Sequence, residues 1–173
     1  MCSGCVTTRD NFEWVKMKFV DFVCFEAMIA ELKATDRDGV IAELVSALAD
    51  SGRLKQTHRR DISRAVIERE NEASTGIGKG IAVPHVKHPM VKNIVATVGK
   101  SSNGIDFSAL DKQPVYSVLL LLSPADNPDM HLQAMESIFK HLQQERFRKF
   151  LRQCQKNEQI EDLLREADEN PLL

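Results

Sequence analysis

The chain has 173 residues, a length that suits one domain with a sizeable core, and 43% of them are hydrophobic and 28% charged. A formal net charge of −2 and an aromatic content of 6% argue against nucleic acid or an anionic membrane surface as the partner. No apolar run approaches the about 18 residues of a membrane-spanning helix, and charges from Arg9 to Lys18 interrupt any secretion signal. We therefore expect a cytoplasmic protein whose four cysteines are free thiols.

The N-terminal stretch over residues 1–16 shows no hydrophobic periodicity, and we expect an extension that is disordered or that precedes a true initiator at Met17. Cys2 and Cys5 have the C-x-x-C spacing of a zinc or redox site. They have no second cysteine pair and no neighbouring histidine, so unpaired thiols are the favoured interpretation.

The first elements of the domain are predicted over residues 28–70. A short strand is expected over residues 28–32, followed by a helix capped by Thr35 or Asp36 that ends at Gly52. A second helix is expected over residues 60–70, with Ile62, Ala65 and Val66 toward the core.

A glycine-rich stretch follows, with the sequence S-T-G-I-G-K-G-I-A-V-P-H-V-K-H over residues 74–88. Its three glycines predict a loop with free backbone N–H groups, and such a loop can form a concave anion site. The apolar run over residues 81–83 predicts a short strand, and Pro84 favours an extended backbone before it. His85 is thus expected at a strand end beside the loop, where it could accept a phosphoryl group. The stretch is not a Walker A loop, because Lys79 is followed by glycine instead of serine or threonine.

The second half of the chain predicts strands over residues 94–98, 104–107 and 115–122, the last so uniformly apolar that we expect it to be central. After a loop over 123–129, a helix is expected to bury one face. That face comprises Leu132, Met135, Phe139 and Leu142. Two shorter helices are predicted over 146–153 and 158–167. Strands that alternate with helices predict a layered α/β domain.

His131 falls in the first turn of the helix that follows the central strand. Helix N-termini favour anions, and ligand sites in α/β sheets gather beyond the carboxyl ends of strands. Position alone leaves two alternatives open: His131 faces His85, or it is a polar residue in water.

The residues from Arg69 to His85, R-E-N-E-A-S-T-G-I-G-K-G-I-A-V-P-H, closely resemble the active-site signature of enzyme IIA domains of the bacterial phosphotransferase system. The resemblance is to the fructose, mannitol and nitrogen-regulatory class, and it covers nearly the whole chain. It implies an N-terminal extension over 1–16, one three-layer α/β domain over 17–169 and a C-terminal tail over 170–173. The implied fold is a mixed β-sheet with helices on both faces.

The resemblance also implies the roles of the site residues. His85 is the implied phosphorylated residue, His131 the second active-site histidine, and Arg69 the arginine near the phosphohistidine. A helix C-terminus also favours a cation at Arg69 without any functional role. Backbone N–H groups of the loop are expected to hold the phosphate, namely those of Ser74, Thr75, Gly76, Ile77 and Gly78.

The implied reaction needs no metal and no cofactor. The family's donor is the phosphocarrier HPr, and its acceptor is an enzyme IIB domain in sugar-transport members. His85 and His88 form an H-x-x-H pair, but a strand end before Pro89 with no third ligand argues against metal binding. His58 and His141 are interpreted as surface residues.

Two alternatives to a transport role stay open. The chain could be a stand-alone nitrogen-regulatory-type protein that acts through phosphorylation-dependent binding of another protein, or a degenerate binding domain. Two departures from the family pattern put the partner in doubt. Val86 stands where a small residue usually follows the histidine, and Lys79 stands where some members have a polar or acidic residue.

Overall fold

The computed structural model describes residues 16–170 and residue 173. Within this range the helices are α1 (Phe19–Phe22), α2 (Arg37–Asp50), α3 (Arg59–Glu72), α4 (Pro128–Leu142), α5 (Glu145–Gln153) and α6 (Asn157–Glu169), with 3₁₀ turns η1 (Phe25–Ala27) and η2 (Gln56–His58). The strands are β1 (Gly76–Gly78), β2 (Ile81–Ala82), β3 (His85–His88), β4 (Val95–Ile105) and β5 (Val115–Pro124). Apart from Lys16, the predicted extension over residues 1–16 lies outside the described residues.

The sheet is built around β5, as its apolar run predicts. β5 pairs antiparallel with β4, and on its other side it pairs parallel with both β2 and β3. Ile81 pairs with Ser117 and His85 with Leu121, so β2 and β3 pair with β5 in the same register and follow one another along it. We call these two strands, which are separated by a break at Val83 and Pro84, the β2–β3 lane. β1 adds an antiparallel strand beside β2, which completes a mixed sheet.

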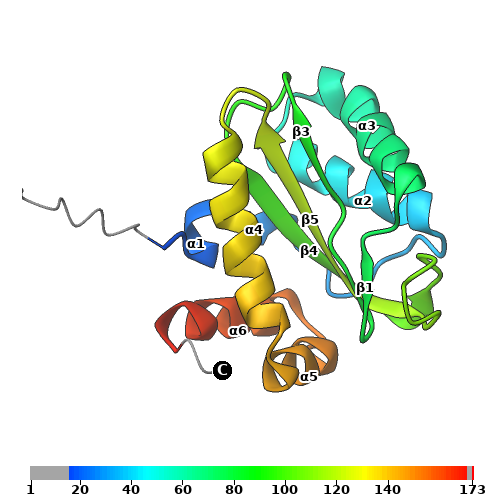
Figure 1. Cartoon of the computed structure of the whole chain (residues 1–173), viewed down its shortest axis with the longest axis vertical. Helices are drawn as coiled ribbons and strands as arrows, with labels where there is room; N and C mark the ends of the chain where they lie inside the picture. Colours follow the sequence, from blue (N-terminus) through cyan, green and yellow to red (C-terminus); the bar gives the residue numbers. More distant parts are fainter. Residues whose placement is uncertain (1–15, 171–172) are drawn as a thin grey trace, which may run out of the picture.

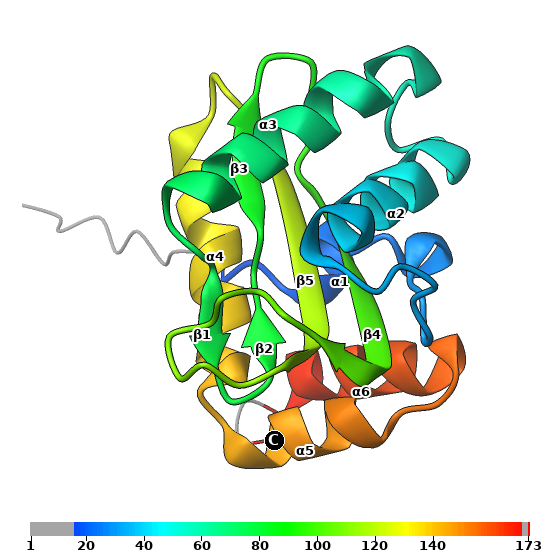
Figure 2. The same ribbon diagram turned by 90° about the vertical axis from the view of Figure 1, so that its right-hand side faces the viewer.

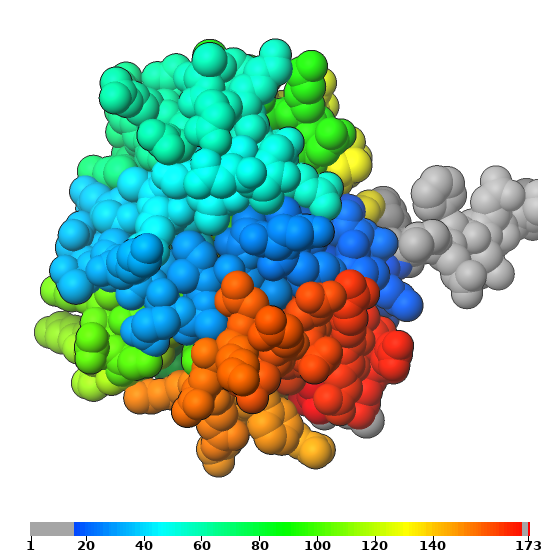
Figure 3. Space-filling model, turned by 180° about the vertical axis from the view of Figure 1, so that it is seen from behind, coloured from blue at the N-terminus to red at the C-terminus, as the bar shows by residue number. Residues whose placement is uncertain are grey.

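Helices cover both faces of this sheet, which confirms the predicted three-layer α/β fold (Figures 1 and 2). Alternation along β5 supplies both layers of the core: Leu120 and Leu122 belong to the cluster with α2 and α3, whereas Leu119 and Leu121 belong to the cluster with α1, α4 and α6. From behind, the segment that follows residue 16, in blue, lies between α2 and the C-terminal helices (Figure 3).

The first two long helices begin and end much as the sequence predicts. Asp36 is the N-cap of α2, and its carboxylate accepts a hydrogen bond of 2.9 Å from the Gly39 N–H. Gly52 follows the helix with φ of +79°, the left-handed conformation of a C-terminal glycine. In α3, Ile62 and Val66 are buried as expected, while Ala65 is only half-buried.

Several element predictions are wrong. No strand forms over residues 28–32; instead Val23 and Ile29 make isolated parallel bridges to Ala96 and Gly99, with η1 between them and a bend after Ile29. β4 continues to Ile105 and so absorbs the start of the piece expected over 104–107. Leu173, in the predicted C-terminal tail, is 2% exposed and packs in the core cluster with α4 and α6.

The buried face of α4 is also displaced from the predicted one. Leu132 is 64% exposed, and the residues that face the sheet are His131, Ala134, Ile138, His141 and Leu142. His141, interpreted from the sequence as a surface residue, is 4% exposed and lies with its ring centroid 5.0 Å from Phe19. Burial lowers the pKa of His141, so this imidazole is part of the core in its neutral form.

Candidate active site

His85 lies where the β2–β3 lane resumes after its break. The Leu121 N–H donates to the Pro84 carbonyl oxygen at 3.0 Å, which keeps the lane paired to β5 through the proline. The His85 Nδ1 lies 2.8 Å from the carbonyl oxygen of Val83. Because a carbonyl oxygen can only accept, Nδ1 carries the proton of the neutral ring, and Nε2 keeps its lone pair. His85 is half-buried, so this lone pair belongs to a partly open imidazole.

His131 lies in the first turn of α4, directly after β5. The Asn127 side chain caps the helix by accepting a hydrogen bond of 3.2 Å from the Met130 N–H, and Pro128 occupies the first turn. The ring centroids of His131 and His85 are 5.5 Å apart, with the planes at 42°. Of the two alternatives that position leaves open, the structure has the one in which the histidines face each other.

The environment of His131 keeps its ring neutral. The ring is 7% exposed, and burial, together with the nearby His85 and Lys87, lowers the pKa of His131 to about 4. His85 and Lys87 lie two residues apart on β3, so both side chains are on the face of the sheet that α4 covers. At neutral pH the site therefore holds a neutral His131 beside a lysine ammonium.

Ser74 and Thr75 lie beside the strand that leads to His85, because the Val83 N–H donates to the Thr75 carbonyl oxygen at 3.2 Å. Their polar groups are engaged. The buried Glu70 carboxylate accepts hydrogen bonds from the Thr75 N–H at 2.6 Å and from its hydroxyl at 2.7 Å. The Gly76 N–H donates to the Ser74 hydroxyl at 3.1 Å. The expectation of free N–H groups is thus wrong for Thr75 and Gly76.

The glycines that follow serve a tight hairpin. Lys79 and Gly80 form the turn between β1 and β2 with φ of +58° and +77°, and positive φ at both central residues is typical of two-residue hairpin turns. Gly78 pairs with Ile81, four residues before His85, or about 13 Å away at 3.3 Å per residue. The turn therefore lies away from the histidines, and it contains Lys79, one of the two departures from the family pattern.

Close approach explains the glycine at position 76. A Cβ atom there would lie 2.8 Å from both Cα and Cβ of Ala109, which is closer than packed atoms can come. Ile77, the one β1 residue with a large side chain, is 36% exposed. β1 is therefore held between β2 and Ala109 as a strand that covers the sheet edge, and this fixes the position of residues 74 and 75 just before it.

Arg69 occupies the last turn of α3, where its Nη1 donates to the carbonyl oxygen of Ala73 at 3.1 Å. This contact corresponds to the structural interpretation of the residue, a cation that satisfies a carbonyl at a helix C-terminus. α3 also packs against β3, the strand that begins with His85 (Figure 2). Arg69 is half-exposed, so its remaining donors are available to solvent or to a ligand.

The residues on the other face of β3 point away from the candidate site. Val86 packs into the core against α2 and α3, so its larger size does not crowd His85. His85 and His88 are three residues apart on a strand and hence on opposite faces, which separates the H-x-x-H pair. Within residues 16–170 and 173, no three metal-binding side chains gather at one point.

Ser123 also belongs to the site, because its Oγ lies 2.8 Å from Nδ1 of His131. Sequence reasoning missed three residues of this site, namely Glu70, Lys87 and Ser123. A usable signal existed for two of them. Lys87 follows His85 at the two-residue spacing of one strand face, and Ser123 is the first polar residue after the leucine run of β5. The sequence gives no comparable sign that Glu70 reaches back to Thr75.

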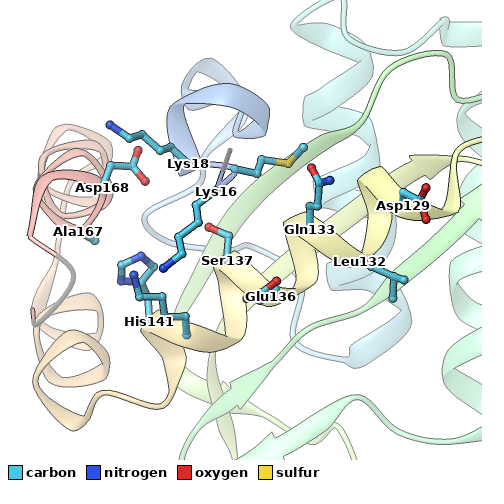
Figure 4. A pocket seen from close by; sticks show the side chains of 12 residues that line it. Lys16, Lys18, Asp129, Leu132, Gln133, Glu136, Ser137, His141, Ala167 and Asp168 are labelled. Atoms are coloured by element: carbon cyan, nitrogen blue, oxygen red, sulfur yellow. The ribbon is translucent and has the colours of Figure 1, made fainter. Parts of the chain in front are cut away.

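A separate groove of about 730 Å³ lies along the outer side of α4 (Figure 4). Residues 16–18, which precede α1, and the end of α6 supply its other walls, with Lys18 and Asp168 at one end and Leu132 at the other. Among the described residues that line it there is neither His85 nor His131.

None of the helices in the described ranges is long and apolar enough to cross a membrane.

The described residues thus form a layered α/β fold in which two histidines face each other at the sheet edge. The sequence matches the family described as phosphoenolpyruvate-dependent sugar phosphotransferase system, EIIA 2, over residues 24–167, and the chain belongs to this family.

Curated relatives carry two kinds of name. The chain is 32% identical over 145 residues to the fructose-specific EIIA component of Haloferax volcanii, covering 83% of this chain and 92% of the relative. It is 32% identical over 136 residues to a nitrogen regulatory protein of Bradyrhizobium diazoefficiens, covering 79% and 87%. It is also 30% identical over 152 residues to the fructose-specific EIIABC component of Bacillus subtilis; this match covers 88% of the chain but spans only 24% of that protein.

Solved structures share the fold. The nitrogen regulatory protein IIA-Ntr from Neisseria meningitidis superposes with a TM-score of 0.75 at 22% identity, over 83% of this chain and 97% of that one. The mannitol enzyme IIA of Escherichia coli, in its complex with phosphorylated enzyme IIB, superposes with a TM-score of 0.68 at 19% identity, over 82% and 95%.

Proposed function

We propose that this protein is a phosphocarrier that accepts a phosphoryl group on Nε2 of His85 from an HPr-type phosphohistidine protein. The observation that carries the proposal is the His85 ring itself, whose Nδ1 is engaged by the Val83 carbonyl at 2.8 Å while a second imidazole faces it at 5.5 Å. This arrangement leaves one nucleophilic nitrogen free and provides a neutral partner beside it.

The reaction is an exchange of one N–P bond for another. The His85 Nε2 lone pair attacks phosphorus, the N–P bond of the donor phosphohistidine breaks, and the electron pair returns to the donor's ring. Nδ1 of His85 keeps its proton throughout, so no proton has to leave the attacking ring. Such transfers pass through a loose transition state with charge spread over three equatorial oxygens, so catalysis is mainly positioning and charge stabilisation. The donor is already activated, and the proposed reaction uses no metal or cofactor.

His131 and Arg69 are proposed to stabilise that charge. A neutral imidazole donates one N–H to a phosphoryl oxygen, and a guanidinium could offer two parallel donors if it turned from the Ala73 carbonyl. In the Ser74–Gly78 segment, Ser74 and Thr75 are nearest to His85 along the paired strands. We propose that this segment supports the phosphate site by its fixed position, with Gly76, Ile77 and Gly78 forming the cover strand.

The acceptor is proposed to be an enzyme IIB domain. The relatives named as fructose-specific components and the mannitol enzyme that forms a complex with phosphorylated enzyme IIB support this choice. The Bacillus subtilis relative is much longer than this chain, and a part in fructose transport is proposed for this chain together with the IIB acceptor.

Labelling tests the proposal directly. The purified protein is incubated with phosphoenolpyruvate, enzyme I and HPr, and the phosphate is mapped. We expect an acid-labile phosphate on His85, no label on a His85→Ala variant, and slower labelling of His131→Ala. His88→Ala is the matched control, since His88 is on the same strand but on its opposite face, and it should label normally. Normal labelling of His85→Ala would refute the assignment.

A regulatory role is the second candidate, favoured by the 32% identity to the Bradyrhizobium nitrogen regulatory protein. In this role the added charge of about −2 would switch the binding of another protein instead of passing to a IIB domain. Transfer from the labelled protein to IIB domains encoded near its gene separates the two: transfer favours transport, and a stable label that changes binding of a regulatory protein favours regulation.

A further inference from the structure

We propose that Ser123 is a positioning residue that fixes the tautomer of His131, so that His131 presents an Nε2–H donor toward His85. The catalytic meaning of this inference rests on the proposed function, but the tautomer itself is a property of the unmodified protein.

The contact between the two residues is short and shielded from water. The Ser123 Oγ and the His131 Nδ1 are 2.8 Å apart, Ser123 is 0% exposed and His131 is 7% exposed. Ser123 lies near the end of β5, and His131 follows eight residues later in the first turn of α4. Strand and helix are both rigid elements, and only residues 125–127 connect them, so the two side chains are held close to each other.

Two proton arrangements could join these atoms, and only one satisfies the serine. If His131 carried its proton on Nδ1, the ring would donate to Oγ, and the serine hydroxyl would need another acceptor. Within residues 16–170 and 173, the contact with His131 is the only hydrogen bond of the Ser123 side chain. A buried hydroxyl proton without an acceptor is costly. The arrangement that satisfies both groups has the Ser123 hydroxyl donating to Nδ1, which leaves the ring proton on Nε2.

The resulting pair of rings is complementary. His85 has its proton on Nδ1 and a lone pair on Nε2, because Nδ1 donates to the Val83 carbonyl. His131 has the opposite tautomer, with a lone pair on Nδ1 and a proton on Nε2. The His131 Nε2 has no hydrogen-bond partner among the described residues, yet it is not one of the buried atoms that lack one, so it is accessible. It can therefore donate to an oxygen of a phosphoryl group on His85.

The opposite tautomer would make the site repulsive. With the proton on Nδ1, His131 would aim a lone pair at the phosphoryl oxygens and offer them no donor. Ser123 would thus decide whether the second histidine stabilises the phosphoryl group or repels it.

Ring-nitrogen NMR of the unphosphorylated protein tests the tautomer. We expect wild-type His131 to show a pyrrole-type Nε2 and a pyridine-type Nδ1 at pH 7. In Ser123→Ala the Nδ1 loses its donor, and we expect a mixture with a measurable Nδ1–H fraction. Ser117→Ala is the matched control, because Ser117 is also buried on β5, on the same face but at the far end from His131. It should leave the His131 signals unchanged.

The rate of labelling by phosphorylated HPr gives the second readout. We expect Ser123→Ala to label about three- to tenfold more slowly, the effect of losing one neutral hydrogen bond, and Ser123→Thr, which keeps a hydroxyl, to restore the Nε2–H tautomer and most of the rate. A wild-type His131 with its proton on Nδ1, or an unchanged tautomer in Ser123→Ala, would overturn the inference. If the wild-type tautomer is as expected but no HPr labels the protein, the tautomer assignment stands and the proposed function fails.

Discussion

At the scale of single residues, the site depends on two histidines that have opposite surroundings. His85 is half-buried and bonded to a backbone carbonyl, which fixes its nucleophilic nitrogen. His131 is nearly enclosed, and its enclosure keeps it uncharged at neutral pH. The division between a nucleophile and a neutral donor thus follows from burial and hydrogen bonding, although the two side chains are chemically identical.

The low pKa of His131 predicts a loss of stability in mild acid. The pKa of His131 is about 4 in the folded protein and about 6.5 in an unfolded chain. Between these two pH values the unfolded state binds a proton at this residue and the folded state does not. The free energy of unfolding should fall as pH drops from 6.5 toward 4, by at most about 3 kcal/mol from this residue. Urea titrations across this range should show a shallower fall in His131→Gln than in the wild type.

A residual pH dependence should persist in that variant, because burial also lowers the pKa of His141. The double variant His131→Gln, His141→Gln should be flatter still. Identical pH profiles for the wild type and His131→Gln would contradict the assignment of a neutral, buried His131.

Lys87 offers a smaller and separate test. Its ammonium is on the same face of β3 as His85 and contributes, after burial and His85, to the lowered pKa of His131. Lys87→Met should therefore raise the pKa of His131, as measured by NMR titration of its ring protons. Lys92→Met, a change of the same charge at an exposed position beyond β3, is the control and should have no effect on His131. An unchanged pKa in Lys87→Met would place the lysine ammonium too far away to matter.

At the scale of elements, the buried Glu70 joins the end of α3 to the segment before β1. Its carboxylate accepts two hydrogen bonds from Thr75, and Thr75 in turn pairs with Val83 just before His85. Glu70→Gln replaces one acceptor oxygen by an amide that can only donate, which leaves a buried donor of Thr75 without its partner. We expect a loss of about 1–3 kcal/mol in urea unfolding, together with slower labelling. Glu72→Gln, an exposed carboxylate in the same helix, should change neither.

The sequence predicted the elements best where a single pattern determined the structure. The leucine run of β5 is typical of a strand covered on both faces, and Asp36 and Gly52 mark the limits of α2 by local backbone chemistry. The face of α4 was misjudged because His131 and His141 count as polar in a sequence pattern, although both are buried. The glycine cluster suggested an anion site, whereas positive φ at Lys79 and Gly80 shows a hairpin turn. Ser123 could be found as the first polar residue after the leucine run, but its hydrogen bond with His131, like that of Glu70 with Thr75, depends on how separate elements pack.

At the scale of the whole molecule, β5 lies between the two halves of the core and contributes side chains to both. One cluster lies under α2 and α3, the other under α1, α4 and α6, and successive leucines of one strand enter them alternately. The clusters therefore share a backbone with fixed register, and neither can lose its packing without disturbing the strand that supports the other. This coupling also holds the lane of His85 against the end of β5 that precedes His131.

Paired substitutions in β5 test this coupling. Leu120→Ala opens a cavity in the cluster under α2 and α3, and Leu121→Ala opens one in the cluster under α4; both leucines are 0% exposed. Each should lower the free energy of unfolding by about 2–5 kcal/mol, the usual range for a buried leucine. Because the clusters share one strand, both variants should unfold in a single transition, with circular dichroism and NMR signals from the two halves giving the same midpoint. Separate midpoints for the two clusters in either variant would show that the layers unfold independently. Leu121 pairs with His85, so its variant should also slow labelling, whereas Leu120→Ala, which points to the other face, should slow it less.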